Sequence, residues 1–297
     1  MFNIPTILAE IIPSGEVFWD YSQPPSGVAL AGLFFLLILC VGVVLDLGLA
    51  LCFLKRSPRP RVWYEDLAAR ALPGKLILIL LLTLTALYVV CSLVYSALFP
   101  YAHELKPHTL LFQALFFHVP ALVVLSGIFI HRRASGREQL GISWRRAPSM
   151  LGLSVLLYLA AIPILWFYSM LYQVLLYQYG FNLYLQEVAE VFLAPAPALE
   201  RVAMYFVAIV LAPVFEEFVF RGVLLPWVVR RVGLWSGIAV VSLVFAGMHF
   251  HLPSFLPLFL LSAMFCVAYA RTRSLLVPIG MHACFNAVTV ILLALTG

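Results

Sequence analysis

The chain has 297 residues, of which 64% are apolar and 10% are charged. Soluble domains carry about 25% charged residues, so this composition excludes an ordinary water-soluble fold and indicates an integral membrane protein. The net charge of +5 does not indicate nucleic-acid binding, because the basic residues lie in short loops between apolar segments, where they act as topology signals.

A helix needs about 20 apolar residues to cross the hydrocarbon core of a bilayer. We therefore predict an all-α, polytopic transmembrane helical bundle of about eight spans. The predicted spans lie at about 27–54, 76–99, 109–130, 149–177, 203–228, 234–250, 255–270 and 275–295. They divide the chain into an N-terminal transmembrane region of four spans (1–200) and a C-terminal core of four spans (201–297). Only residues 251–254 separate the sixth and seventh spans, which predicts a helical hairpin.

The distribution of the 18 Lys and Arg residues predicts the orientation of the spans. Lys106 and Arg201 follow even-numbered spans and Arg221 lies inside a span, whereas all the others follow odd-numbered spans. By the positive-inside rule the basic loops are cytoplasmic and both termini lie on the non-cytoplasmic side. Residues 1–26 contain no Lys or Arg and only a short apolar stretch, so we expect the first span to be a retained anchor and not a cleaved signal.

Two loop segments are expected to lie at the membrane surface. Residues 62–72 begin with aromatic residues that suit the headgroup region, and residues 181–193 form an outer segment that ends before Pro195. The cysteines all fall within apolar runs and show no metal-binding spacing. We expect them to be small core residues; they are Cys40, Cys52, Cys91, Cys266 and Cys284.

Three ionisable residues interrupt the fifth predicted span: Glu216, Glu217 and Arg221. A charge at the centre of a bilayer costs at least about 2.5 kcal/mol, so such groups usually face a protein interior or a wet cavity. Glu217 and Arg221 are four residues apart and can pair on one helix face, whereas Glu216 points about 100° away. One carboxylate is then left for chemistry, although the same cluster also suits a structural ion pair.

Two more polar motifs follow in the next spans. His249 lies near the outer end of the sixth span, after the small pair Ala246 and Gly247, which predicts a close helix contact. His282 and Asn286 are four residues apart in the last span and face one side, where both can donate hydrogen bonds to an oxyanion. Taken singly, His249 also suits an interfacial position, and the His282–Asn286 pair suits an interhelical hydrogen bond.

Taken together, these motifs supply the carboxylate base, the imidazole and the oxyanion donors that amide hydrolysis needs. The other polar residues within spans are scattered, and we expect them to be helix contacts; they are Asp46, Gln113 and His118.

On straight helices the three motifs would lie at different depths in the membrane. A common site therefore requires tilted helices, a late start of the sixth span, or a break near Pro213 or Pro226 in the fifth.

The three motifs, in this order on successive helices, resemble those of the CPBP intramembrane proteases, a family that includes the type II CAAX prenyl endopeptidases and bacterial relatives linked to bacteriocin processing or immunity. The motifs are Glu-Glu-x-x-x-Arg at 216–221, Phe-x-x-x-His at 245–249 and His-x-x-x-Asn at 282–286. The resemblance covers residues 200–295. It implies an eight-helix bundle with a cavity open towards the cytoplasm.

The resemblance also implies roles for single residues. Glu216 matches the glutamate that activates the attacking water together with the histidine matching His249. His282 and Asn286 match the pair assigned to the oxyanion hole. The residues that match supporting positions are Glu217 and Arg221.

Two histidines and a glutamate are also a ligand set that catalytic zinc accepts, and the family has often been labelled a metalloprotease. The His-Glu-x-x-His helix is absent from this sequence, and an arginine lies beside the glutamates. We therefore predict catalysis without a metal or cofactor, with zinc as the alternative.

The function predicted from the sequence is an intramembrane endopeptidase that cleaves a membrane-associated or lipidated peptide with water activated by Glu216 and His249. The alternative is a non-catalytic membrane scaffold or bacteriocin-immunity protein that keeps the polar cluster as a structural network. A transporter is a third reading, but no internal symmetry supports it. The expected surroundings are the lipid bilayer, in a prokaryotic inner membrane, with no nucleic-acid partner.

Overall fold

The computed structural model describes residues 26–55, 60–100, 106–131, 140–143, 145–184 and 186–296. Helices joined by short turns make up these ranges, and the predicted all-α class is confirmed. The first half of the chain contains α2 (Ser26–Lys55), α3 (Pro60–Ala69), α4 (Gly74–Leu98), α5 (Pro107–Gln113), η1 (Ala114–His118), α6 (Val119–His131) and α8 (Ala147–Gln178). The second half contains α9 (Glu187–Leu193), α10 (Ala198–Phe206), η2 (Val207–Leu211), α11 (Ala212–Glu217), η3 (Phe218–Leu224), α12 (Leu225–Val232), α13 (Leu234–Gly247), α14 (Leu252–Thr272) and α15 (Leu276–Thr296).

Within the described ranges, seven helices are long and apolar enough to cross a membrane. They coincide with seven of the predicted spans, and the transmembrane bundle is confirmed to that extent. The sixth predicted span corresponds to α13, whose 14 residues make a helix of about 21 Å, shorter than the roughly 30 Å of a hydrocarbon core. An eighth crossing, and with it the side on which the termini lie, stays a prediction.

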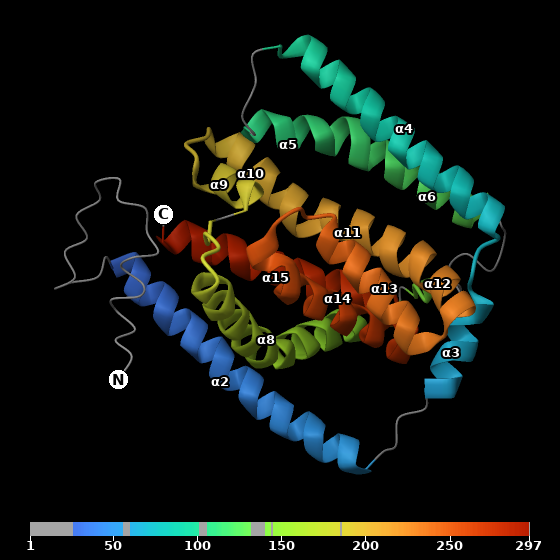
Figure 1. Cartoon of the computed structure of the whole chain (residues 1–297), viewed down its shortest axis with the longest axis horizontal. Helices are drawn as coiled ribbons and strands as arrows, with labels where there is room; N and C mark the ends of the chain where they lie inside the picture. The colour runs from blue at the N-terminus through green and yellow to red at the C-terminus, as the bar shows by residue number, and fades with distance from the viewer. Residues whose placement is uncertain are drawn as a thin grey trace.

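The helices of the C-terminal part lie in the middle of the molecule (Figure 1). Helices α4, α5 and α6 flank them on one side, and α8 and α2 flank them on the other. Contacts agree with this view, because α8 packs against α2, α14 and α15, whereas α5 packs against α10. Helix α3 lies across one end, against α12 and α14.

Large hydrophobic side chains cover much of the exterior along the predicted spans. Examples more than half exposed are Leu33, Val44, Leu78 and Ile130. Water would make such a surface unstable, whereas lipid tails solvate it well. The exposed surface therefore fits a protein that sits in a bilayer.

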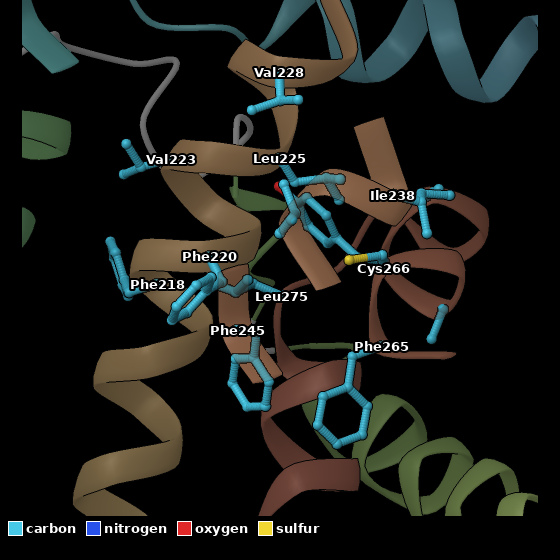
Figure 2. Close-up of a cluster of buried hydrophobic side chains, with 14 of the residues drawn as sticks. Phe218, Phe220, Val223, Leu225, Val228, Ile238, Phe245, Phe265, Cys266 and Leu275 are labelled. Atoms are coloured by element: carbon cyan, nitrogen blue, oxygen red, sulfur yellow. The ribbon is translucent and has the colours of Figure 1, made fainter. Parts of the chain in front are cut away.

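The central core gathers buried aromatic rings from three helical segments (Figure 2). Phe218 and Phe220 come from η3, Phe245 from α13 and Phe265 from α14, and all are buried. The rings of Phe220 and Phe245 meet edge to face with centroids 5.0 Å apart. This packing fixes η3 against α13, which are the segments that carry two of the polar motifs.

In the part of the chain that the structure describes, three segments are π-helical, and each ends two residues before a proline. The prolines are Pro120 after η1, Pro213 after η2 and Pro226 after η3. Proline has no backbone N–H, and its ring collides with the carbonyl four residues earlier in an α-helix. Bonding over five residues moves that carbonyl away, so the fifth span runs from Ala198 to Val232 as one candidate span. The prolines therefore widen this helix locally instead of breaking it.

Two sequence expectations about packing were wrong. Among the described residues, no atom beyond the local backbone lies within 4 Å of the position that a Cβ on Gly247 would take, so no close helix contact is seen at Gly247 there. The close approaches occur instead at Gly237, against Val229, and at Gly280, against Ser154. Cys40 is exposed and not in the core, because α2 lies at the periphery of the bundle.

The remaining expectations concern the other cysteines, the two surface segments and the first span. Cys91 and Cys266 are buried, and Cys284 is partly buried. Both surface segments contain a helix, namely α3 and α9. The side chain of Cys52 and residues 1–25, which include most of the segment relevant to the retained anchor, lie outside the described residues.

Candidate active site

Glu217 and Arg221 form a buried ion pair, as their spacing predicts. The Nη1 atom of Arg221 donates to Oε1 of Glu217 over 2.8 Å, and both side chains have no exposed surface. Burying either charge alone would cost several kcal/mol, and the contact between them offsets part of that cost. The pair therefore forms a fixed charged unit inside the bundle.

The other nitrogen of the Arg221 guanidinium binds helix α14. Nη2 donates to the hydroxyl oxygen of Ser262 over 2.8 Å and to its carbonyl oxygen over 3.0 Å. Two core rings complete the surroundings, because the guanidinium carbon lies 4.9 Å from the ring centre of Phe245 and 5.1 Å from that of Phe265. Cation–π contact adds to the hydrogen bonds at such distances. Arg221 thus joins the fifth span to α13 and α14.

Glu217 also holds the imidazole of His282. The Nδ1 atom of His282 lies 2.9 Å from Oε1 of Glu217, the oxygen that Arg221 also contacts. A carboxylate oxygen only accepts hydrogen bonds, so Nδ1 carries the proton. The other ring nitrogen, Nε2, is therefore the one that can exchange a proton with a third group.

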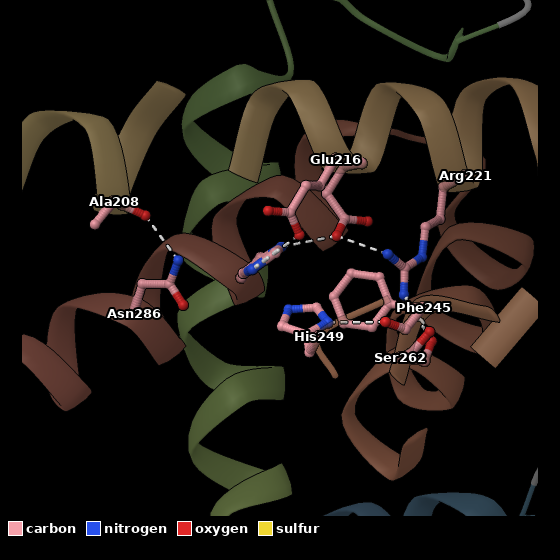
Figure 3. A network of polar contacts seen from close by, with 9 residues as sticks. Ala208, Glu216, Arg221, Phe245, His249, Ser262 and Asn286 are labelled. Carbon is pink, nitrogen blue, oxygen red and sulfur yellow. Dashed lines mark hydrogen bonds and ion pairs between the residues drawn. The ribbon is translucent and has the colours of Figure 1, made fainter. Parts of the chain in front are cut away.

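Glu216 is placed differently from its neighbour. Its side chain is 25% exposed, and its Oε2 atom lies 3.9 Å from Nε2 of His282, too far for a direct hydrogen bond. That oxygen accepts no hydrogen bond from any described residue. Figure 3 shows Glu216 and Arg221 projecting from one helix towards the rings of Phe245 and His249. Oε2 of Glu217 also has no hydrogen bond from the described residues, but the Glu217 side chain is fully buried. Glu216 is thus the carboxylate of the pair whose side chain keeps some exposed surface.

His249 lies just past the end of α13, and its Nδ1 atom is 2.8 Å from the carbonyl oxygen of Phe245. The carbonyl only accepts, so Nδ1 is protonated and Nε2 carries the lone pair of the neutral ring. The Phe245 ring connects the motifs, because its centre lies 4.9 Å from the His249 ring and 5.9 Å from the His282 ring. Phe245 is therefore the shared wall between the second and third motifs.

Asn286 is held by the fifth span through a backbone carbonyl. Its Nδ2 atom donates to the carbonyl oxygen of Ala208 over 2.7 Å (Figure 3). In η2 the N–H of Ala212 bonds to Val207, and the next residue, Pro213, has no N–H. The two backbone donors that could reach Ala208 are therefore not available, and the carboxamide of Asn286 takes their place. The second hydrogen of that amide remains for another acceptor.

The structure brings Glu216, Glu217, Arg221 and His282 into one network, with His249 joined to it through Phe245. Asn286 lies one turn beyond His282 on α15 and contacts the fifth span separately. The depth difference expected for straight helices does not separate the motifs. The sixth span ends at Gly247, so His249 sits in a turn, and the fifth span is widened at η2 and η3.

Two residues of this site escaped the sequence reasoning. Ser262 binds Arg221 and is fully buried; the signal for it was a serine in the apolar middle of α14. The carbonyl of Ala208 binds Asn286, and the signal for it was Pro213 five residues later.

Of the three residues expected to be helix contacts, His118 lies near the site. The ring of His118 packs against Phe215 with centroids 5.1 Å apart, which joins η1 to α11. The backbone carbonyl of Gln113 lies 3.2 Å from Nδ1 of His118, and Asp46 lies partly exposed on α2.

A catalytic zinc needs three protein ligands that converge on one point. In the part of the chain that the structure covers, no group of three or more His, Cys, Asp or Glu side chains is arranged to hold a metal ion. Oε1 of Glu217 is already shared by Arg221 and His282, so this oxygen is not a spare ligand. The residues do not fit a zinc site, and metal-free catalysis stays a prediction.

Residues 198–288 match the family model described as type II CAAX prenyl endopeptidase Rce1-like. No curated protein and no solved structure matches the chain. The matched segment contains every motif residue discussed above, and the resemblance inferred from the motifs is confirmed over this segment. The match suggests CAAX-type intramembrane protease activity, carried by a protein whose apolar helices indicate a lipid bilayer environment.

Proposed function

We propose that this protein is an intramembrane endopeptidase that hydrolyses a peptide bond of a membrane-associated or lipidated protein or peptide. One observation carries the proposal. A carboxylate oxygen of Glu216, with no hydrogen bond from the described residues, faces Nε2 of His282 across 3.9 Å inside an apolar bundle. The gap is too long for a direct bond, and a polar atom of a substrate or a water molecule can bond to both sides of it.

Glu216 is the general base in this proposal. Its carboxylate accepts a proton from the attacking water, and the lone pair on Nε2 of His249 orients the same water. The resulting hydroxide oxygen forms a bond to the carbonyl carbon of the scissile amide. General-base catalysis of this kind contributes about 10²- to 10⁴-fold to a rate.

His282 and Asn286 stabilise the oxyanion that forms on the carbonyl oxygen. Asn286 can donate its second amide hydrogen, because the first one is used by Ala208. His282 can donate from Nε2 only as an imidazolium, since its Nδ1 hydrogen points to Glu217. Glu217 accepts the Nδ1 hydrogen and so fixes which ring nitrogen faces the substrate, which is the role we assign to the buried carboxylate.

The reaction closes without any further reactant. The protonated carboxyl of Glu216 returns its proton to the amide nitrogen, the C–N bond breaks, and the products are a carboxylic acid and an amine. Water supplies both the hydroxyl of the acid and the hydrogen of the amine. Glu216 therefore acts as base and then as acid.

The substrate and the cell membrane are part of the same proposal. A peptide that is anchored in or lipidated onto the bilayer reaches a site between helices without leaving the membrane. We place the protein in a prokaryotic inner membrane, where its basic loops would face the cytoplasm. A scaffold or immunity protein is the competing function, and it would need the same network only for stability.

A comparison of peptides derived from membrane proteins tests the proposal. Cells would express the wild type, Glu216→Gln or the control Glu65→Gln, which changes an exposed carboxylate on α3 in the same way. Fragments that appear with the wild type and with Glu65→Gln but not with Glu216→Gln support a protease. Persistence of these fragments with a zinc chelator supports the metal-free mechanism, and identical profiles with equal expression favour the scaffold.

A further inference from the structure

The turn between α13 and α14 places three consecutive residues in different surroundings. The side chain of His249 faces Phe245 in the candidate site, Phe250 is 92% exposed, and His251 is buried with 7% exposure. His251 is the second histidine of the sequence His-Phe-His, and the mechanism proposed above does not use it. Its burial therefore needs a separate explanation.

Phe250 holds an unusual backbone conformation in this turn. Its φ is +48°, in the left-handed region that side chains with a Cβ rarely adopt. Helices often end with a residue in this region, but that residue is usually glycine. Because the exposed phenyl ring gains nothing from packing, contacts elsewhere must keep the backbone of Phe250 in this conformation.

His251 supplies such contacts with both of its ring nitrogens. Nε2 lies 3.0 Å from the carbonyl oxygen of Tyr184 and must donate to it, so in the neutral ring Nδ1 accepts from the hydroxyl of Ser254, 2.7 Å away. The Tyr184 ring also meets the His251 ring edge to face at 4.9 Å. These bonds connect the turn to the segment after α8, and nothing in them involves the candidate site directly.

A further bond ties the turn to α8 itself. The hydroxyl of Tyr172 donates to the carbonyl oxygen of Leu252 over 3.0 Å. His251 and Leu252, which follow Phe250, are thus held by the segment after α8 and by α8 itself. The residue before Phe250 is His249, whose side chain forms one wall of the site.

We propose that His251 is a positioning residue of the proposed protease: its bonds to Tyr184 and Ser254 hold Phe250 in the left-handed conformation, and this fixes the ring of His249 at the site. The inference rests on the proposed function. A loop needed only to connect two helices could use glycine at position 250 and would need no buried imidazole. The combination of a strained residue and a fully bonded histidine next to His249 points to control of the His249 position.

Strain relief at residue 250 gives a specific test. His251→Ala should lower kcat about tenfold or more, because Phe250 then relaxes and moves His249. Phe250→Gly/His251→Ala should recover most of that loss, since glycine adopts a positive φ without strain. Phe250→Ala/His251→Ala is the matched control, because alanine removes the ring but keeps the strain, and it should recover nothing.

The measurement uses purified full-length protein in lipid vesicles and a synthetic peptide that spans a cleavage site found with the wild type. We expect the differences between the variants to lie in kcat, with KM within about twofold of the wild type. Tm should fall in His251→Ala and recover in Phe250→Gly/His251→Ala but not in Phe250→Ala/His251→Ala. Equal loss in both double variants, or wild-type kcat in His251→Ala, overturns the proposal. Recovery of Tm without recovery of kcat also overturns it, because His251 is then structural only.

Two further outcomes stay distinguishable. If His251→Ala does not fold, His251→Phe, which keeps a ring of similar shape but has no donor for Tyr184 and no acceptor for Ser254, replaces it in both double variants. If the wild type produces no Glu216-dependent fragments, the proposed function fails and with it the positioning role. The glycine-specific change in Tm then still decides whether His251 holds the turn.

Discussion

Oε1 of Glu217 lies 2.9 Å from Nδ1 of His282 and 2.8 Å from Nη1 of Arg221, so one oxygen atom joins the first and third motifs. This contact decides the protonation of the His282 ring at Nδ1 and turns Nε2 towards Glu216. It also assigns different work to two adjacent carboxylates. Glu217 is bonded to Arg221 and His282, whereas we propose that Glu216 serves the substrate.

The first prediction separates these two roles through Glu216. Glu216→Gln removes the base but breaks no hydrogen bond at Oε2, where the described residues supply none. We expect cleavage of a peptide substrate to fall at least about 100-fold while Tm stays within about 2 °C of the wild type. Activity assays and thermal unfolding in the same detergent measure both quantities. Substantial residual activity in a well-folded variant would remove Glu216 from the mechanism.

The second prediction concerns Glu217, for which the outcome should differ. Glu217→Gln leaves the buried guanidinium of Arg221 without its counter-charge, and loss of one partner of a buried pair costs about 3–5 kcal/mol. We therefore expect a lower Tm together with lost activity. Glu65→Gln is the control, since its ion pair with Arg61 is exposed and should contribute little. A Tm equal to that of Glu216→Gln would contradict the structural role.

Much of the fold could be predicted from the sequence, because hydrophobic length and loop charges are local properties. Most predicted span boundaries fall within a few residues of the helices, as α8 and α15 illustrate. The spacing of Glu217 and Arg221 predicted their ion pair for the same reason, since four residues make about one helical turn. These features depend on the helix itself and not on its neighbours.

The rest of the site depends on how helices meet, and spacing alone does not determine that. Neither the contact of His282 with Glu217 nor that of Arg221 with Ser262 follows from the order of motifs. Pro213 and Pro226 indicated a disturbance of the fifth span, but a proline alone does not determine whether the helix breaks or widens into a π-helical segment. Spacing alone also could not predict that, among the described residues, no other helix closely approaches the Cβ position of Gly247.

The third prediction uses the fork geometry of Arg221. Its two terminal nitrogens bind Glu217 and Ser262 at the same time, which a single ammonium group cannot reproduce over both directions. Arg221→Lys should therefore lower the stability by about 1.5–3 kcal/mol, the value of a hydrogen bond to a charged group, and reduce activity with it. Thermal unfolding measures this, with Arg61→Lys at the surface as control. An unchanged Tm would show that charge alone is required.

The last prediction follows from Pro213 and the carbonyl of Ala208. Pro213→Ala restores a backbone N–H one position after Ala212, so that η2 can return to α-helical bonding and Ala208 no longer needs Asn286. The carboxamide would then lose its anchor, and a displaced oxyanion donor lowers the rate. We expect activity to fall about 10- to 100-fold without a loss of Tm, since an internal proline is itself unfavourable in a helix.

Two matched variants complete this test. Pro163→Ala changes another proline inside a helix, on α8 against Gly42 of α2, and should leave activity unchanged. Asn286→Ala removes the donor directly, and adding Pro213→Ala to it should cause little further loss, because both changes act through the same carboxamide. Additive losses in the double variant would mean that Pro213 affects the site by another route than the Ala208 carbonyl.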